Sequence, residues 1–112
     1  MYTESIIGEI KQFGFGFTPK GYAPCSGQIL DINKNTALFS LLGTTYGGDG
    51  YRTFALPNLN GRAVVGSGKS EGESNFEMGQ KGVVGSQGQG LAYMTLNYCI
   101  CVDGIFPYRN DY

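Results

Sequence analysis

The sequence contains no histidine, and this absence removes the commonest general base and the commonest metal ligand together. A hydrolase of the Ser-His type is therefore excluded, although Ser26 and Ser40 are present. Lysine and cysteine chemistry stay open, but no pattern indicates them. The carboxylates Glu9, Asp31 and Asp103 are scattered, and the sequence alone cannot pair them as acid and base.

Cysteine is also scarce, with Cys25, Cys99 and Cys101 as the three examples. Cys99 and Cys101 are two residues apart in a strand-like run, so both point to one face and a disulfide between them would be strained. A zinc site needs about four nitrogen or sulfur ligands, more than these three supply. We therefore expect buried free thiols that behave as small hydrophobic groups, and no metal or cofactor.

Charged residues make up only 15% of the chain, and the net charge is −1. No basic patch stands out, so nucleic acid is not an expected partner. No apolar run approaches the ~20 residues of a membrane helix, so no membrane insertion is expected. The start, MYTESIIGEIKQF, lacks a charged region followed by an apolar one, so we expect no signal peptide and synthesis in the cytoplasm.

Glycine and aromatic residues are abundant instead. Glycine accounts for 19 of 112 residues, well above the usual share of about 7%, and there are eight Tyr and seven Phe. The glycines keep no period of three, which excludes collagen, and 41% hydrophobic residues can build a small core. The composition predicts one small α+β domain, mostly β, with short strands, one short helix and long Gly-rich loops.

The strongest strand pattern lies in LAYMTLNYCICVDG, residues 91–104, where apolar residues occupy both alternating sets of positions. Leu96, Tyr98, Ile100 and Val102 fill one set, so we expect a central strand covered on both faces. Further short strands are expected at residues 6–13, 22–25, 28–32, 53–56 and 63–65. A tight turn at Ser26 and Gly27 would join two of them, residues 22–25 and 28–32, into a pair.

One short helix is predicted at about residues 35–43. Asn33 or Asn35 would cap its start and Gly43 would end it. The residues expected on its buried face, by spacing, are Ala37, Leu38, Leu41 and Leu42. A helix of about two turns is not stable alone, so it must dock on a sheet.

The Gly-rich stretch at residues 66–90 predicts an exposed loop, with Val83 and Val84 as a brief strand pairing. Its start, GSGKS, has the wrong glycine spacing for a phosphate-binding loop. Asp49, in GGDG, is a single carboxylate, whereas calcium prefers six or more oxygens, so a turn residue is expected there. Exposed tyrosines could stack on sugar rings, but tyrosines more often lie in a core or a subunit interface.

Candidate contact residues for a partner or receptor are therefore chosen from the loops and the aromatic residues. They are Tyr46, Asp49, Tyr51, Ser67, Lys69, Phe76, Gln87, Gln89 and Tyr93.

The run ALFSLLGTTYGGDGYRTFALPNLNGR, residues 37–62, resembles the phage tail collar domain, also seen in proteins called microcystin-dependent. Residues 8–30 and 96–110 are similar to the beginning and end of such proteins. The resemblance implies a single collar-type domain over residues 1–112. It also implies a structural protein rather than an enzyme: a homotrimeric tip, fibre or collar component of a phage tail or contractile injection particle. Its partners would be itself and the tail, baseplate or fibre proteins.

Longer relatives carry a receptor-facing insertion between the collar and the final strand, often with histidines that can bind metal. Here residues 66–90 take its place without histidine, so the resemblance implies no metal-bound receptor tip. The shortened loop is the candidate contact surface, possible contacts being partner subunits or a host surface. A different class of function stays open: a stand-alone module that binds a cell-surface glycan through exposed tyrosines. Release from the cell would follow lysis or particle assembly.

Overall fold

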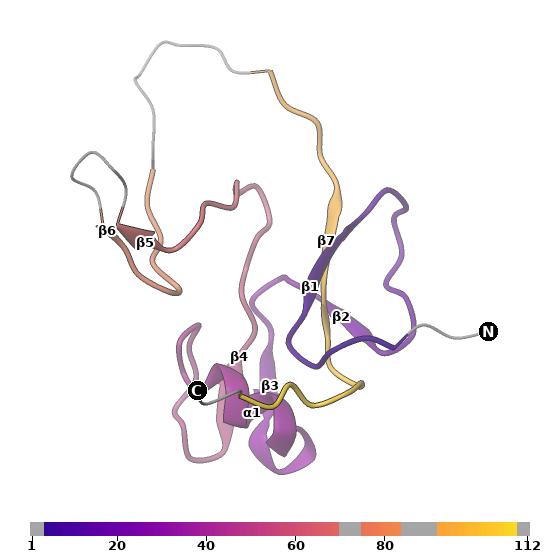
Figure 1. Ribbon diagram of the computed structural model, residues 1–112, viewed down its shortest axis with the longest axis vertical. Coiled ribbons are helices and arrows are strands. Elements are labelled where there is room, and N and C mark those ends of the chain that lie inside the picture. Colours follow the sequence, from indigo (N-terminus) through magenta and orange to yellow (C-terminus); the bar gives the residue numbers. More distant parts are fainter. Residues whose placement is uncertain (1–3, 70–74, 84–91, 110–112) are drawn as a thin grey trace.

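The computed structural model describes residues 4–69, 75–83 and 92–109 (Figure 1). Three small antiparallel sheets organise this part of the chain, with strand orders β1-β7-β2, β3-β4 and β5-β6. The elements are β1 (Ile10–Phe13), β2 (Tyr22–Pro24), β3 (Ile29–Asp31), η1 (Ile32–Lys34), α1 (Thr36–Leu42), β4 (Thr53–Ala55), β5 (Gly68–Lys69), β6 (Asn75–Phe76) and β7 (Asn97–Cys101). Short strands with one short helix confirm the predicted α+β class, mostly β.

β7 is the central strand of the three-stranded sheet, as predicted. Its Ile100 lies opposite Ile10 of β1 on one side and Ala23 of β2 on the other. Cys99, Ile100 and Cys101 are all buried, because both faces of the strand are covered. The sheet therefore joins the first strands of the chain to its last strand. β7 is shorter than predicted, since Leu96 precedes it and is 48% exposed.

The predicted pairing of the second and third strands is wrong. β2 pairs with β7, and β3 pairs with β4, where Leu30 lies opposite Phe54. At the turn between them, the Cys25 N–H donates to the Tyr98 carbonyl at 3.1 Å and the Gly27 N–H donates to the Pro57 carbonyl at 3.1 Å. These long-range bonds take up the backbone groups that a local hairpin would use, so the chain changes sheets.

The strand expected at residues 6–13 is interrupted. Only Ile10–Phe13 forms β1, and Ile6 forms an isolated parallel bridge with Ile105. Gly8 lies between them with φ of +89°, a conformation outside the strand region, which accounts for the break.

Two further strand predictions are wrong. Residues 63–65 form no strand, and Val64 and Val65 are 57% and 54% exposed. Val83 lies in no strand and is 98% exposed, whereas its expected companion Val84 is outside the described residues. The only pairing described within residues 66–90 is β5 with β6. High β-propensity alone did not select these segments, because each needs a partner edge to pair with.

The predicted helix is present as α1, and Gly43 ends it with φ of +56°. The Gly43 N–H donates to the Phe39 carbonyl at 2.8 Å. Asn35 is at the N-cap position but makes no side-chain cap for α1; its amide nitrogen donates instead to the Asp31 carbonyl at 3.0 Å. Asp31 caps the preceding η1, where its carboxylate accepts the Asn33 N–H.

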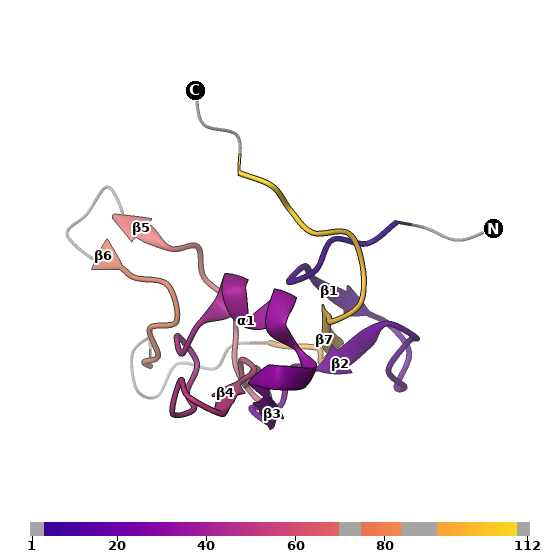
Figure 2. The ribbon, with the colours of Figure 1, turned by 90° about the horizontal axis from the view of Figure 1, so that it is seen from below.

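The buried face of α1 differs from the predicted one. Leu38 is buried and Leu42 half-buried, but Ala37 is exposed and Leu41 is 38% exposed. A seven-residue helix presents one narrow stripe to its neighbour, and this stripe is Leu38 and Leu42, with Phe39 beside it. The Phe39 and Phe54 rings lie 5.4 Å apart, which places α1 over β3 and β4 (Figure 2).

The core is formed by the described elements from both halves of the chain. Its buried members are Ile7, Cys25, Leu38, Phe54, Leu56 and Ile100. The three cysteines are buried free thiols, which confirms that prediction. Burial, with the nearby Cys99 thiol as a smaller cause, raises the pKa of Cys25 to about 11, so this thiol stays protonated at neutral pH.

Candidate functional site

Asp49 organises the glycine-rich turn between α1 and β4. One carboxylate oxygen accepts the backbone N–H groups of Tyr51, Arg52 and Thr53 at 2.8, 2.9 and 3.0 Å. These three hydrogen bonds, led by the one from Arg52, lower the pKa of Asp49 to about 2. The Asp49 N–H in turn donates to the Thr53 hydroxyl oxygen at 3.2 Å. Asp49 is therefore a turn residue, as predicted.

The same turn lies tightly against β4. The Ala55 N–H donates to the Gly47 carbonyl at 3.0 Å, and the Gly50 N–H donates to the Thr53 carbonyl at 2.9 Å. Gly48 has φ of +94°, and a Cβ atom there would overlap the Phe54 Cα. Close packing on the β4 backbone thus accounts for glycine at position 48.

The melting temperature of an Asp49→Asn variant should fall less than that of the wild type when the pH is lowered from 6 to 2. The Asp49 pKa is lower in the folded protein than in the unfolded chain, so its contribution is present above pH ~4 and is lost as the pH falls toward 2. We expect the variant to melt a few degrees below the wild type at pH 6 and at nearly the same temperature at pH 2. Thermal melts monitored by circular dichroism test this; a melting difference independent of pH would contradict it.

The two tyrosines of this turn differ in exposure. Tyr46 is half-buried, and burial, with the nearby Cys25 thiol as a smaller cause, raises its pKa. Tyr51 is 89% exposed, so most of its side chain is open to solvent. Of this pair, Tyr51 is therefore the better candidate for an outside contact, and Tyr46 belongs to the packing of the loop.

The candidates in the shortened loop lie on or beside the β5–β6 pair. Lys69 is opposite Asn75 and Phe76 is opposite Gly68, while Ser67 is exposed just before β5. This pair stands apart from the β1-β7-β2 sheet (Figures 1 and 2).

The segment after β6 returns to the body of the protein. Gly79, with φ of +81°, lies so close to Thr45 that a Cβ atom would collide with the Thr45 side chain. The segment after β6 therefore lies beside the residues between α1 and the GGDG turn. Gln87 and Gln89, the remaining loop candidates, lie outside the described residues.

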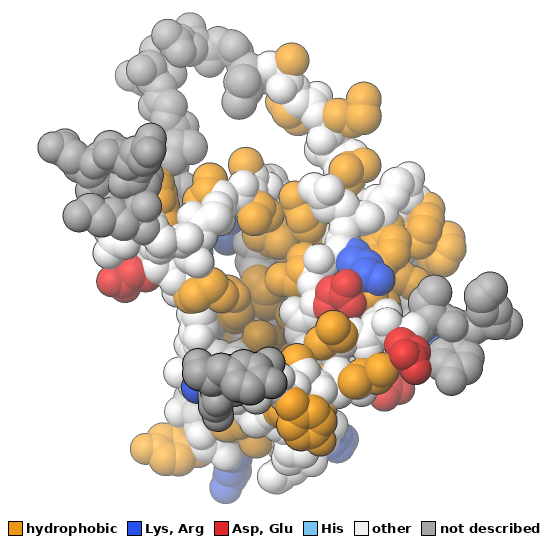
Figure 3. All heavy atoms as spheres, in the orientation of Figure 1, with side chains coloured by type: hydrophobic (Ala, Val, Ile, Leu, Met, Phe, Trp, Pro, Cys, Tyr) orange, Lys and Arg blue, Asp and Glu red, His pale blue; other side chains and the backbone are white. Residues whose placement is uncertain are grey.

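Tyr93 is placed elsewhere, on the wall of a groove beside β7. We call this hollow of about 840 Å³ the β7 groove. Residues 59–64 line one wall and residues 93–98 the other, and Gln12 and Ser26 also contribute. The Gln12 side-chain amide donates to the Tyr98 hydroxyl oxygen at 2.6 Å. Tyr93 is 87% exposed. Figure 3 shows hydrophobic side chains along the segment that leads into β7.

The groove residues other than Tyr93 were not among the predicted contacts. The sequence did carry a signal for them: residues 63–65 and the run before β7 were both predicted as strand, and neither belongs to a strand in the structure. Their approach depends on segments about 30 residues apart in the chain, which no local pattern specifies.

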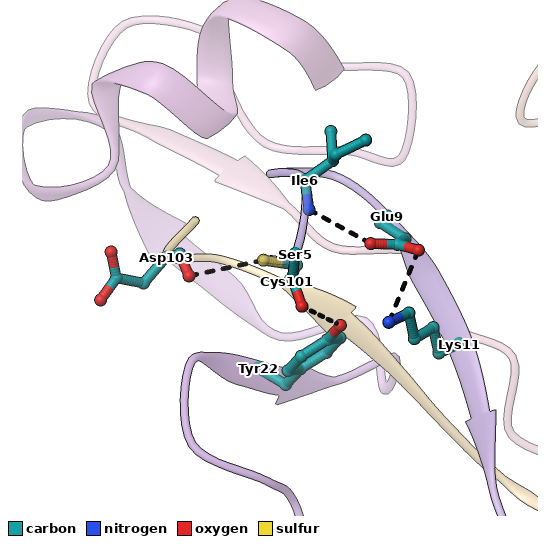
Figure 4. Close-up of polar contacts among 7 residues, drawn as sticks. All are labelled: Ser5, Ile6, Glu9, Lys11, Tyr22, Cys101 and Asp103. Carbon is teal, nitrogen blue, oxygen red and sulfur yellow. Dashed lines mark hydrogen bonds and ion pairs between the residues drawn. The ribbon is translucent and has the colours of Figure 1, made fainter. Parts of the chain in front are cut away.

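Polar side chains also gather where the N-terminal segment meets the end of β7 (Figure 4). The Glu9 carboxylate accepts the Ile6 N–H at 3.2 Å and lies 3.7 Å from the Lys11 ammonium. The Tyr22 hydroxyl, and then Glu9, raise the pKa of Lys11. The Tyr22 hydroxyl donates to the Ser5 hydroxyl oxygen at 2.9 Å. These contacts fasten chain segments to one another.

Within residues 4–69, 75–83 and 92–109, no group of three or more His, Cys, Asp or Glu is placed to hold a metal ion. In the same part of the chain, no helix has the length and apolar character needed to cross a bilayer.

The family model described as Phage Tail Collar Domain matches residues 8–64, just over half of the 112-residue chain. A search of the curated proteins found no match. The matched residues contain the first four strands, α1, the Asp49 turn and one wall of the β7 groove.

Proposed function

Because the chain belongs to the Phage Tail Collar Domain family, we propose that it is a homotrimeric tip, fibre or collar component of a phage tail or of a phage-tail-like contractile injection particle. The family is one of structural tail domains, and a structural role related to the tail fibre follows from membership. The match over residues 8–64 is the observation that carries this proposal.

The described geometry supports a scaffold rather than a reactive site. The GGDG turn is occupied by its own hydrogen bonds, since the one Asp49 oxygen accepts three backbone N–H groups. The polar cluster of Glu9, Lys11 and Tyr22 links chain segments. The core also combines Ile7 and Ile100 with residues of the matched region, which supports one domain over residues 1–112.

Exposed apolar side chains support association into a trimer. Large hydrophobic residues on the surface include Phe17, Val64, Met94 and Tyr108, exposed by 65, 57, 87 and 86%. A domain this small buries only about 60–70% of its unfolded surface, and neighbouring subunits supply further burial. Synthesis in the cytoplasm and release with the finished particle complete the proposal.

The proposal predicts a trimer in solution and a place in the particle. Light scattering after size-exclusion chromatography should give three times the 12.0 kDa chain mass. Mass spectrometry of tail particles purified from the producing strain should detect the chain, and antibody-coated grids should locate it at one end. A monomer at all concentrations would overturn the trimer. Absence of the chain from purified particles would overturn the structural role itself.

A host-glycan contact is a second candidate, favoured by the 89% exposure of Tyr51. An exposed aromatic ring offers a face on which a sugar can stack. Glycan-array binding that is lost on Tyr51→Ala and kept on Val83→Ala would support this contact. Absence of glycan binding by the wild-type trimer would overturn it.

A further inference from the structure

The segment that leads into β7, residues 92–96, belongs to no strand, although its last residues share hollows with residues 13–16 and with residues 59–64. Pairing with β1 stops at Phe13 opposite Asn97, and pairing with β2 stops at Pro24 opposite Cys99. Among the described residues, no hydrogen bond reaches residues 92–96. Figure 1 shows this segment running on from β7, past the ends of β1 and β2. An unpaired strand extension of this kind is a template for a further strand.

The opposite wall of the β7 groove also has backbone groups without a hydrogen-bond partner among the described residues. Residues 63–65 have the composition of a strand, yet among the described residues they make no backbone hydrogen bond and belong to no sheet. Val64 and Val65 are both more than half exposed. The one charged side chain on the groove wall, Arg62, donates to the Asn58 carbonyl at 2.7 Å. The Arg62 side chain is therefore paired within the chain, whereas the backbone groups of residues 63–65 have no partner among the described residues.

Large apolar side chains are exposed around the β7 groove. Tyr93 and Met94 are each 87% exposed, Leu96 is 48% exposed, and Val64 and Val65 add to them. Together these side chains expose on the order of 600 Å², the upper end of what a monomer usually leaves open. A standard interface buries about 800 Å² on each partner. In a ring, each subunit would divide these side chains between its two contacts, so they would form the apolar part of each interface and neighbouring residues would supply the rest.

We propose that a second copy of the chain fills the β7 groove, adding its own residues 63–65 as a strand along residues 92–96. This contact would pair the backbone of residues 63–65 of one copy with the backbone of residues 92–96 of the next. Both segments lack a partner among the described residues, and both are on the same chain. A different partner would cover one and leave the other exposed. Because donor and acceptor surfaces differ, the contact is head-to-tail, and it closes into a ring in a trimer. This inference rests on the proposed homotrimer.

The test compares Val64→Asp and Met94→Asp with Val83→Asp, which changes a 98% exposed valine outside the groove. All three sites are exposed, so each variant should fold, as circular dichroism would verify. We expect the two groove variants to dissociate at concentrations at least roughly tenfold higher than the wild type does, because a carboxylate would be buried without a partner. Val83→Asp should assemble like the wild type.

Hydrogen exchange provides a second readout, specific to strand pairing. The amides of residues 93–96 should be protected in the assembled wild type and exchange freely in Met94→Asp monomers. A wild-type trimer whose groove variants assemble normally, or whose residues 93–96 exchange freely, would overturn the groove contact and leave the homotrimer standing. A monomeric wild type would overturn both.

Discussion

A Gly48→Ala variant should lose about 3 kcal/mol or more of its unfolding free energy. The φ of +94° costs an L-residue about 1–2 kcal/mol, and the added Cβ would overlap the Phe54 Cα and lie 2.7 Å from the Thr53 carbonyl oxygen. Both groups are backbone atoms of β4, so no side chain can rotate away. A domain of this size is stabilised by roughly 6–17 kcal/mol, so the loss is a large fraction of the total.

Two other glycines serve as controls that separate the cost of a positive φ from the cost of the steric overlap. Gly61 has φ of +69° but nothing within 4 Å of its Cβ position, and Gly66 has neither a positive φ nor a neighbour. In urea titrations, Gly61→Ala should cost about 1 kcal/mol and Gly66→Ala close to nothing. If Gly48→Ala were no less stable than Gly61→Ala, the close packing of the turn on β4 would be wrong.

A Phe54→Ala variant should lose about 3–5 kcal/mol, the usual range for deleting a buried phenyl ring. Phe54 is fully buried and contributes the largest of the fully buried side chains. Its ring contacts Phe39 of α1, and it shares the core with Leu38 and Leu56. The cavity would therefore open between α1 and the β3–β4 pair, and the short helix would lose its main support.

The matched control is Tyr51→Ala, which removes an aromatic ring that is 89% exposed in the neighbouring turn. Its effect on the unfolding free energy should stay within about 0.5 kcal/mol. Circular dichroism at 222 nm during urea unfolding measures both variants. Equal stability of the Phe54→Ala and Tyr51→Ala variants would contradict the position of Phe54 at the centre of the core.

Features that depend on residues close together in the chain could be predicted from the sequence. Thr36–Leu42 is a helix ended by Gly43 because apolar spacing, glycine and the surrounding turns all act within a few residues. The Asp49 turn is local for the same reason, since its carboxylate reaches only two to four residues ahead. β7 was predictable as a central strand because its apolar residues leave no face for solvent. The collar resemblance also followed from a contiguous run.

Which segments meet could not be predicted from the sequence and depends on the folded chain. β2 pairs with β7 rather than with β3, and α1 buries Leu38 and half-buries Leu42, whereas Leu41 is 38% exposed. Residues 63–65 remain without a partner in the single chain although their composition favours a strand. These outcomes depend on contacts between residues tens of positions apart. A local sequence pattern does not show which of several alternative partners a segment will pair with. The β7 groove exists for that reason, because folding brings residues 59–64 opposite residues 93–98.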